Sequence, residues 1–448
     1  MTTVSRLAIG TLQPDADRRP MFWALLELLR REGVQVQSFA SRACFPVHPA
    51  ASVITGRKLR HLDSWLMDEE TGRDFFAQGG QFADVSVVDG QFGSFDAAKN
   101  GLGGELETLC RWLRLPTIVV LDASRLMGAV PKRPERVDGV LLDRVADSQH
   151  FSRWTTDIQA VWHVPVLGSL PASAEFGCKI DKIPPGRAPS TELIRQLGDA
   201  LAETWTPEHF DRLSSDETIP SVENSLFKSE RATLRLNVAV AFDEAFFRYF
   251  PCVLDLLDAR GATVVDFSPL HDEHLPPETD VVLLGGGVPE RHAATLAENH
   301  CMKTALRNHV RWGKRIYGEG GGLALLCQQM ITPEGEHARM AGLLPAVACS
   351  QRSLAEPTPI ETILSRPNWM GRAGDAIRGY RDPGWTIETL GEQADFRTCH
   401  ADSTDLIGTF QTVGSLLEIH FGLQASLMNH FFYPHLCAPP KVDPWRNS

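Results

Sequence analysis

The sequence lacks several features that would place it in a simple class. It has no long apolar run, no excess of basic residues and no CxxC pair. The longest apolar runs, such as residues 117–121 and 281–284, are far too short to cross a bilayer. A formal net charge of −12 argues against nucleic-acid binding, where a basic face supplies most of the affinity. We therefore expect no membrane and no nucleic acid among its partners.

The cysteines form no framework. Nine of them are scattered along the chain, and an odd number without regular spacing favours reduced thiols over disulfides. The first ten residues, MTTVSRLAIG, contain no long apolar core followed by a small-residue cleavage site, so they predict no secretion signal. Both observations predict a cytoplasmic protein.

What the chain does have is length and a regular alternation of elements. Its 448 residues suffice for two or three domains, and a hydrophobic fraction of 43% is ordinary for a protein with sizeable cores. In the first half, short runs that are apolar on both faces alternate with helical stretches such as residues 22–31. This pattern predicts a parallel sheet covered by helices on both sides. The expected strands are residues 6–9, 34–39, 85–89, 117–122, 137–143 and 166–170.

A polar stretch divides the chain in two. Residues 206–235 show little periodicity, and we interpret them as a linker between a first domain at residues 1–205 and a second at residues 236–448. The second domain reads as a further α/β unit. We expect its strands at residues 236–241, 263–267, 281–285 and 315–317, and its helices at residues 246–259 and 293–313.

The second half carries the most specific strings. It contains FSPL at residues 267–270, and a triple glycine at residues 285–287 that is followed by Pro289-Glu290. These strings resemble the glutaminase-type domain of the cobyrinic acid a,c-diamide synthase family.

The first half resembles the ATP-binding domain of the same family. RHLDSW at residues 60–65, after TGR at residues 55–57, resembles its substrate-side motif, and VDGQFGSFD at residues 88–96 resembles an acidic strand end that usually reads EGVMGLYDG. With a closing strand at residues 166–171, the resemblance covers residues 6–432. It implies an α/β fold with an N-terminal, P-loop-type parallel-sheet domain of the dethiobiotin synthetase kind. The C-terminal domain would be flavodoxin-like, of the class I glutaminase type.

The resemblance also implies an activity. Family members make amides on corrin or related tetrapyrrole rings: ATP phosphorylates a side-chain carboxylate, glutamine is hydrolysed in the second domain, and ammonia displaces the phosphate. Such an enzyme needs a phosphate-binding loop with magnesium ligands, a cysteine nucleophile with its histidine, and a tetrapyrrole-binding face.

The phosphate-binding loop departs from that pattern. Counted without gaps, Asp17, Arg18 and Arg19 stand where the family has Gly, Lys and Thr. Arg19 cannot bind magnesium, and Pro14 and Pro20 remove two N–H donors. An arginine at the lysine position can still pair with a phosphate, so weak anion binding remains open. We expect no cofactor and no metal site, with ATP and magnesium only if the chain is an active ligase.

Two aspartates remain near strand ends. Asp89 and Asp96 fall near the carboxyl ends of expected strands, where ligands bind in open α/β sheets. These aspartates could bind a cation or ligand, or they could cap a turn or helix. Both interpretations stay open.

The glutaminase motif has changed most. Glutamine hydrolysis needs a nucleophile at a sharp strand-to-helix turn, activated by a histidine. The family sequence ECGG appears here as Glu319-Gly320-Gly321-Gly322, so glycine occupies the nucleophile position. The family ends in SYxHxHF; here Glu418 takes the place of the first histidine and His420 remains. We expect no catalytic residue. The string RGHEFHYS is matched at residues 397–403, with neither histidine in register.

Three interpretations follow. The first is a catalytically inactive homologue that binds a tetrapyrrole or corrinoid acid, or a protein partner or second copy of itself. The second is an active ATP-dependent synthase with a rebuilt site that uses ammonia. The third is a structural subunit of a larger complex. The candidate ligand-binding residues are Arg18, Arg19, Asp63, Trp65, Asp89, Asp96, Glu319 and His420.

Overall fold

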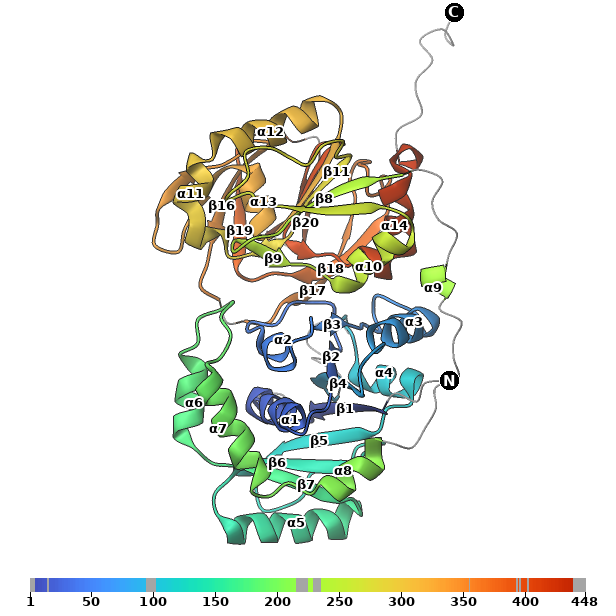
Figure 1. The fold of residues 1–448 in the computed structure, drawn as a ribbon, viewed down its shortest axis with the longest axis vertical. Helices are drawn as coiled ribbons and strands as arrows, with labels where there is room; N and C mark the ends of the chain where they lie inside the picture. The colour runs from blue at the N-terminus through green and yellow to red at the C-terminus, as the bar shows by residue number, and fades with distance from the viewer. Residues whose placement is uncertain are drawn as a thin grey trace, which may run out of the picture. The chain divides into compact units, whose positions relative to one another are not determined.

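A computed structural model describes residues 5–13, 16–93, 102–214, 225–228, 235–353, 355–391, 394, 396–400 and 403–437. The chain divides into two compact units, Met1–Phe227 and Lys228–Ser448. Figure 1 shows the first unit in blue to green and the second in yellow-green to red.

The first unit is built on a seven-stranded, fully parallel sheet in the order β3-β2-β4-β1-β5-β6-β7. Its central strands are buried along almost their whole length, because helices cover both faces and the side chains are apolar in both directions. The sequence-based strands are confirmed to within a few residues, and the short edge strand β3 was not expected. The strands are β1 (Ser5–Thr11), β2 (Val36–Ala40), β3 (Arg60–His61), β4 (Val85–Gln91), β5 (Thr117–Asp122), β6 (Gly139–Val145) and β7 (Val166–Pro171).

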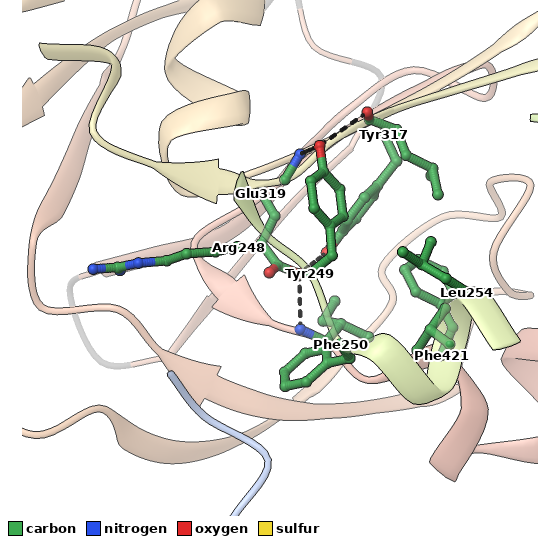
Figure 2. Close-up of a pocket in the computed structure, with 11 residues that line it drawn as sticks. Arg248, Tyr249, Phe250, Leu254, Tyr317, Glu319 and Phe421 are labelled. Atoms are coloured by element: carbon green, nitrogen blue, oxygen red, sulfur yellow. Dashed lines mark hydrogen bonds between the residues drawn. The ribbon is translucent and has the colours of Figure 1, made fainter. Parts of the chain in front are cut away.

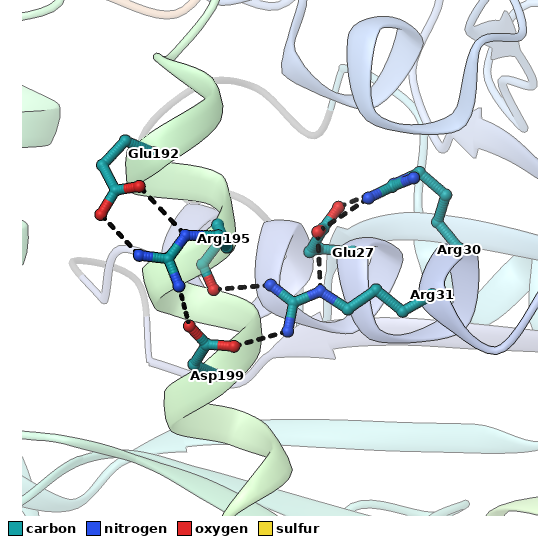
Figure 3. Close-up of polar contacts among 6 residues, drawn as sticks. All are labelled: Glu27, Arg30, Arg31, Glu192, Arg195 and Asp199. Carbon is teal, nitrogen blue, oxygen red and sulfur yellow. Dashed lines mark hydrogen bonds and ion pairs between the residues drawn. The ribbon is translucent and has the colours of Figure 1, made fainter.

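Helices α1 and α7 pack against each other over one face of this sheet. They approach closely at Gly198, where a Cβ atom would lie 2.7 Å from Cγ of Glu27. Glu27 is almost fully buried and binds both Arg30 and Arg31 at 2.8 Å, while Arg31 reaches Asp199 on α7 at 2.7 Å (Figure 3). The helices are α1 (Arg19–Arg31), α2 (Ala50–Thr55), α3 (Glu69–Gly79), α4 (Leu106–Leu113), α5 (Ser148–Trp162), α6 (Ala174–Asp181) and α7 (Thr191–Ala202).

The expected linker begins with a helix. α8 (Pro207–Ser214) packs on the first unit, where Phe210 joins the core that holds α1 and α7. The next described piece is α9 (Ser225–Lys228), where Phe227 meets Phe75 with ring centroids 5.5 Å apart. Residues 215–224 and 229–234 lie outside the described residues, so the linker itself stays a prediction.

The second unit contains a seven-stranded sheet in the order β10-β8-β11-β13-β22-β21-β20. Its first five strands are parallel and, numbered along the chain, have the order 2-1-3-4-5 of flavodoxin-like sheets. β21 and β20 then add an antiparallel edge. The expected fold class is therefore confirmed in both halves. The strands are β8 (Asn237–Ala241), β10 (Thr263–Phe267), β11 (Val281–Leu284), β13 (Arg315–Glu319), β20 (Phe396–His400), β21 (Ser403–Gly408) and β22 (Thr412–Ser415).

Two expected helices of this unit differ from the structure. Residues 246–248 form strand β9 (Phe246–Arg248) paired with β12 (Gly286–Gly287), and α10 (Pro251–Ala259) begins only at its proline. Residues 293–313 form two helices, α11 (Ala293–Glu298) and α12 (His300–Arg311), because Asn299 leaves the helical conformation and accepts a hydrogen bond from the N–H of Met302 at 3.0 Å.

Smaller sheets and short helices complete the second unit. Strands β14, β15, β16 and β19 form one sheet, and β17, β18 and β23 form another. Apart from β23, which lies in the string matched to the family's closing SYxHxHF strand, none of these strands was expected from the sequence. They are β14 (Cys327–Ile331), β15 (His337–Arg339), β16 (Leu344–Ser350), β17 (Thr358–Ile363), β18 (Ala376–Arg381), β19 (Trp385–Thr389) and β23 (Leu417–Glu418), with helices α13 (Gly321–Leu326) and α14 (Ala425–Phe432).

Within the described parts of the chain, no helix is long and apolar enough to span a membrane.

Candidate functional site

The first group of candidates lies at the carboxyl edge of the first sheet. Strand β1 ends at Thr11, and α1 begins at Arg19 after a short loop. Arg18 forms a two-pronged contact with Asp89 at the end of β4, at 2.9 and 3.3 Å. Arg19 pairs with Asp17 at 2.8 Å, and Asp17 also accepts the backbone N–H of Arg19 at 3.0 Å. Both cations of the loop thus already face a carboxylate of the same chain.

A second charged cluster at this edge was missed from the sequence. Asp122 ends β5, and its carboxylate lies 3.2 Å from Arg125 and 3.5 Å from Arg144. Asp143 lies in β6 directly before Arg144, and burial raises its pKa to about 7. Arg144 adopts a left-handed backbone with φ of 55°. The sequence could have indicated this cluster, because Asp89, Asp122 and Asp143 each follow a run of apolar residues in a strand.

Asp63 and Trp65, the two candidates in the substrate-side string at residues 60–65, differ in burial. Asp63 is fully buried, and its carboxylate accepts backbone N–H groups of Ala43 at 2.9 Å, Trp65 at 2.9 Å and Leu66 at 3.2 Å. It therefore organises a turn, as an Asx residue does, and its role toward a ligand stays a prediction. Trp65 is half-buried. Asp96 lies outside the described residues.

The second unit forms a sharp turn between β13 and α13. Gly320 has φ of 51° and ψ of −109°, a conformation that strongly favours glycine. The turn is also crowded by its neighbours: a Cβ on Gly322 would lie 1.9 Å from the carbonyl oxygen of Leu284. A Cβ on Gly320, in contrast, would lie 3.4 Å from Oδ2 of Asp382 and 3.8 Å from Cδ1 of Trp385, which is ordinary contact. We call this turn, residues 319–322, the elbow.

The remaining candidates of this unit come together at the elbow. Glu319 is 6% exposed, and its Oε2 accepts the hydroxyl of Tyr317 at 2.8 Å and the backbone N–H of Ile419 at 2.9 Å. Ile419 lies between Glu418 and His420, both buried. The ring of His420 packs against Phe250 with centroids 4.6 Å apart. Burial, with a smaller contribution from the nearby Asp382, raises the pKa of Glu319 to about 7, even though the hydrogen bonds from Ile419 and Tyr317 lower it.

Three charged residues at the elbow were missed from the sequence. Asp382 follows β18 and lies 3.8 Å from Arg248 of β9. Glu290 is half-buried, and burial raises its pKa. A sequence signal for Asp382 was present in Arg378-Gly379, because this pair has the same first two residues as the family string RGHEFHYS. The sequence-based match placed that string at residues 397–403, and residues 397–400 lie in the edge strand β20.

A small pocket opens beside the elbow (Figure 2). Its space for water-sized molecules is about 40 Å³, which is room for a few waters or one very small ligand. Its lining is mainly apolar and aromatic, with Glu319 and Arg248 as the charged members. A tetrapyrrole is far too large for this pocket.

Known proteins match the chain in both halves. Residues 237–380 match the CobB/CobQ-like glutamine amidotransferase domain. A cobyrinate a,c-diamide synthase of Syntrophotalea carbinolica is 29% identical over 402 residues, which cover 84% of each chain. That of Synechocystis is 29% identical over 91% of this chain and 89% of its own. That of Listeria monocytogenes serovar 1/2a is 28% identical over 96% of this chain and 99% of its own. The second unit therefore contains a CobB/CobQ-like glutamine amidotransferase domain, and the chain as a whole is similar to cobyrinate a,c-diamide synthases.

Proposed function

We propose that this chain is a family member that no longer hydrolyses glutamine and that binds a tetrapyrrole or corrinoid acid without amidating it. The observation that supports this most directly is Gly320 at the elbow. The strand-to-helix turn keeps a positive φ and leaves room for a Cβ, but glycine offers no nucleophile there. The position of the histidine base is held by Glu418, a buried carboxylate.

The loop after β1 supports loss of the ATP-dependent step as well. A nucleotide phosphate binds where backbone N–H groups at a helix start are open to it. Here the carboxylate of Asp17 already accepts the N–H of Arg19, and Pro20 has no N–H to offer. Asp89 holds the guanidinium of Arg18. The residues present do not fit a nucleotide phosphate, and we propose no bound cofactor and no metal.

Binding of a tetrapyrrole acid is supported by Trp65, which is half-buried and belongs to the string that resembles the substrate-side motif. A tetrapyrrole acid offers a large π-face, on which an indole stacks. The pocket of the second unit is too small for such a ligand, so the binding surface has to lie elsewhere. A protein partner or a second copy of the chain would replace the tetrapyrrole if none binds.

Titration by visible absorbance tests this proposal. Corrinoid and porphyrinoid acids are added to the purified chain, and we expect at least one to bind with micromolar affinity, about −8 kcal/mol. Trp65→Ala should weaken binding, whereas Trp312→Ala, at a tryptophan that is 74% exposed in the second unit, is the matched control. Asp63→Ala is unsuitable, because it also removes three hydrogen bonds to backbone N–H groups.

Two outcomes would contradict the proposal. If no acid shifts the spectrum, tetrapyrrole binding is wrong, and a protein partner, a second copy of the chain or the structural-subunit interpretation takes its place. If a bound acid is converted to an amide when ATP and ammonia are added, the chain is an active ammonia-dependent ligase.

A further inference from the structure

The pocket beside the elbow combines apolar walls with one buried acid. Phe250, Tyr317 and Phe421 supply aromatic surface, and Val253, Leu254 and Ile419 supply aliphatic surface. The rings of Tyr317 and Phe421 meet edge to face at 5.1 Å, which fixes one wall. In Figure 2 the side chain of Arg248 runs away from these aromatic residues, so its stem rather than its guanidinium borders their part of the pocket.

Glu319 uses only one of its two carboxylate oxygens inside the protein. Both of its hydrogen bonds, from Tyr317 and from the N–H of Ile419, end on Oε2. Within the described residues Oε1 has no hydrogen-bond partner, although the side chain is 6% exposed and lines the pocket. Oε1 is not among the fully buried atoms that lack a partner, so it is open to the pocket and can accept a hydrogen bond from a ligand.

The charges around the pocket favour a cation. Asp382 acts electrostatically on both Glu319 and Glu290, and the Arg248 guanidinium lies 3.8 Å from Asp382. Once these three carboxyls are ionised they outnumber the two cations beside them, Arg248 and Arg291, so an anionic ligand would be repelled. A metal ion does not suit the site, because no group of three or more His, Cys, Asp or Glu donors that could hold one is present in the described chain.

We propose that this pocket binds a small protonated primary amine of about the size of methylammonium, held by Oε1 of Glu319 and enclosed by the aromatic walls. The amine donates a charge-assisted hydrogen bond to Oε1, while its methyl group meets apolar surface. Aromatic faces add attraction for a cation that has left water. This inference does not rest on the proposed function, because Glu319 and the pocket are the same whether or not the chain binds a tetrapyrrole.

Binding should depend on pH through Glu319. Tyr317, Tyr249, Asp382 and Arg248 face this carboxyl or its pocket, and Glu418 acts electrostatically on Tyr317. Burial raises the pKa of Glu319 to about 7. The carboxylate form, which a cation requires, is thus scarce at acid pH, and affinity should rise by roughly tenfold between about pH 6 and pH 8.

Isothermal titration with methylammonium chloride tests the proposal, with sodium chloride and tetramethylammonium chloride as ion controls. We expect saturable binding of methylammonium alone, because sodium lacks N–H donors and tetramethylammonium lacks both the donor and the room. Glu319→Gln should weaken binding by at least about tenfold, since the charge-assisted hydrogen bond is lost. Glu336→Gln, at an exposed glutamate of the same unit, should leave it unchanged.

A second variant tests the proposal in case Glu319→Gln does not fold. Leu254→Trp should fill the pocket from its half-buried rim and abolish binding while leaving the carboxylate in place. Equal heats for methylammonium and sodium in the wild-type chain would overturn the proposal. So would binding by the wild type that is the same at about pH 6 and pH 8, or binding that Leu254→Trp leaves intact.

Discussion

Oδ2 of Asp382 lies 3.4 Å from the point that a Cβ on Gly320 would occupy. A side chain at the elbow would thus face a carboxylate that Arg248 only partly balances. A thiolate is a poor neighbour for such a group, because like charges disfavour ionisation of both. Even a restored cysteine would therefore lack an environment that activates it.

The elbow makes a prediction about two glycines. Gly320→Ala should destabilise the second unit by about 1–2 kcal/mol, the cost of a left-handed backbone in a residue with a Cβ. Gly322→Ala should cost at least about 3 kcal/mol, because its Cβ would lie 1.9 Å from a backbone oxygen and the backbone must move. Urea unfolding of both variants checks this order. Equal losses would mean that the elbow is not packed as described.

Gly320→Cys should restore no glutaminase activity, and neither should the double change with Glu418→His. Asp382 still faces the thiol in both variants, which keeps its pKa high. Adding Asp382→Asn removes that charge and is the informative third variant. Release of glutamate by Gly320→Cys alone would show that the elbow is closer to an active site than the charges indicate.

The sequence predicted the strands and the glycine at the elbow, but it did not predict which residues the charged side chains contact. Buried strands such as β5 and β13 were predicted because they are apolar runs of strand length, and the glycine at the elbow was visible in its motif. The partners of the charged residues were not. Asp382 lies near Gly320 only because the tertiary fold brings distant segments together, and Asp17 pairs with Arg19 because of the local shape of the loop. Neither contact follows from the spacing of apolar residues. Likewise the sequence suggested Asp63 as a ligand-binding residue, but it did not show that the Asp63 carboxylate accepts hydrogen bonds from three backbone N–H groups.

Glu319 should make the second unit less stable as pH rises. Its pKa is raised to about 7 in the folded chain, from an ordinary value of 4.5. The folded state therefore binds more protons between these values, and the free energy of unfolding falls as pH rises through that window. Above about pH 7 the loss levels off, at a size on the order of 3 kcal/mol. Glu319→Gln should flatten the slope, while Glu336→Gln should keep it, as read from urea unfolding across pH.

Glu27 should act with the opposite sign in the first unit. Hydrogen bonds from Arg30 and then Arg31 hold its pKa below the ordinary value. Its contribution to stability is present above about pH 4.5 and is lost as pH falls through the lower, folded pKa. Glu27→Gln should cost about 1–2 kcal/mol at neutral pH, because a buried acceptor for two guanidinium groups is removed. Glu192→Gln, on the exposed side of α7 in Figure 3, should cost much less.

The loop after β1 predicts weak or absent ATP binding. Asp17 and Asp89 neutralise Arg19 and Arg18. Calorimetry with magnesium and ATP should show no micromolar binding by the wild-type chain. The double variant Asp17→Asn and Asp89→Asn should bind inorganic phosphate more tightly than the wild type, since both guanidinium groups lose their carboxylates. Micromolar, magnesium-dependent ATP binding by the wild type would contradict the assignment.

The most direct test of the central claim is glutamate release from glutamine by the purified chain, measured with ATP, magnesium and a tetrapyrrole acid present. We expect no glutamate above the level of a protein-free control, because Gly320 carries no nucleophile and Glu418 is not a base of the histidine kind. Release that a covalent glutamine-analogue inhibitor abolishes would contradict it, and would mean that another group of this chain attacks the amide.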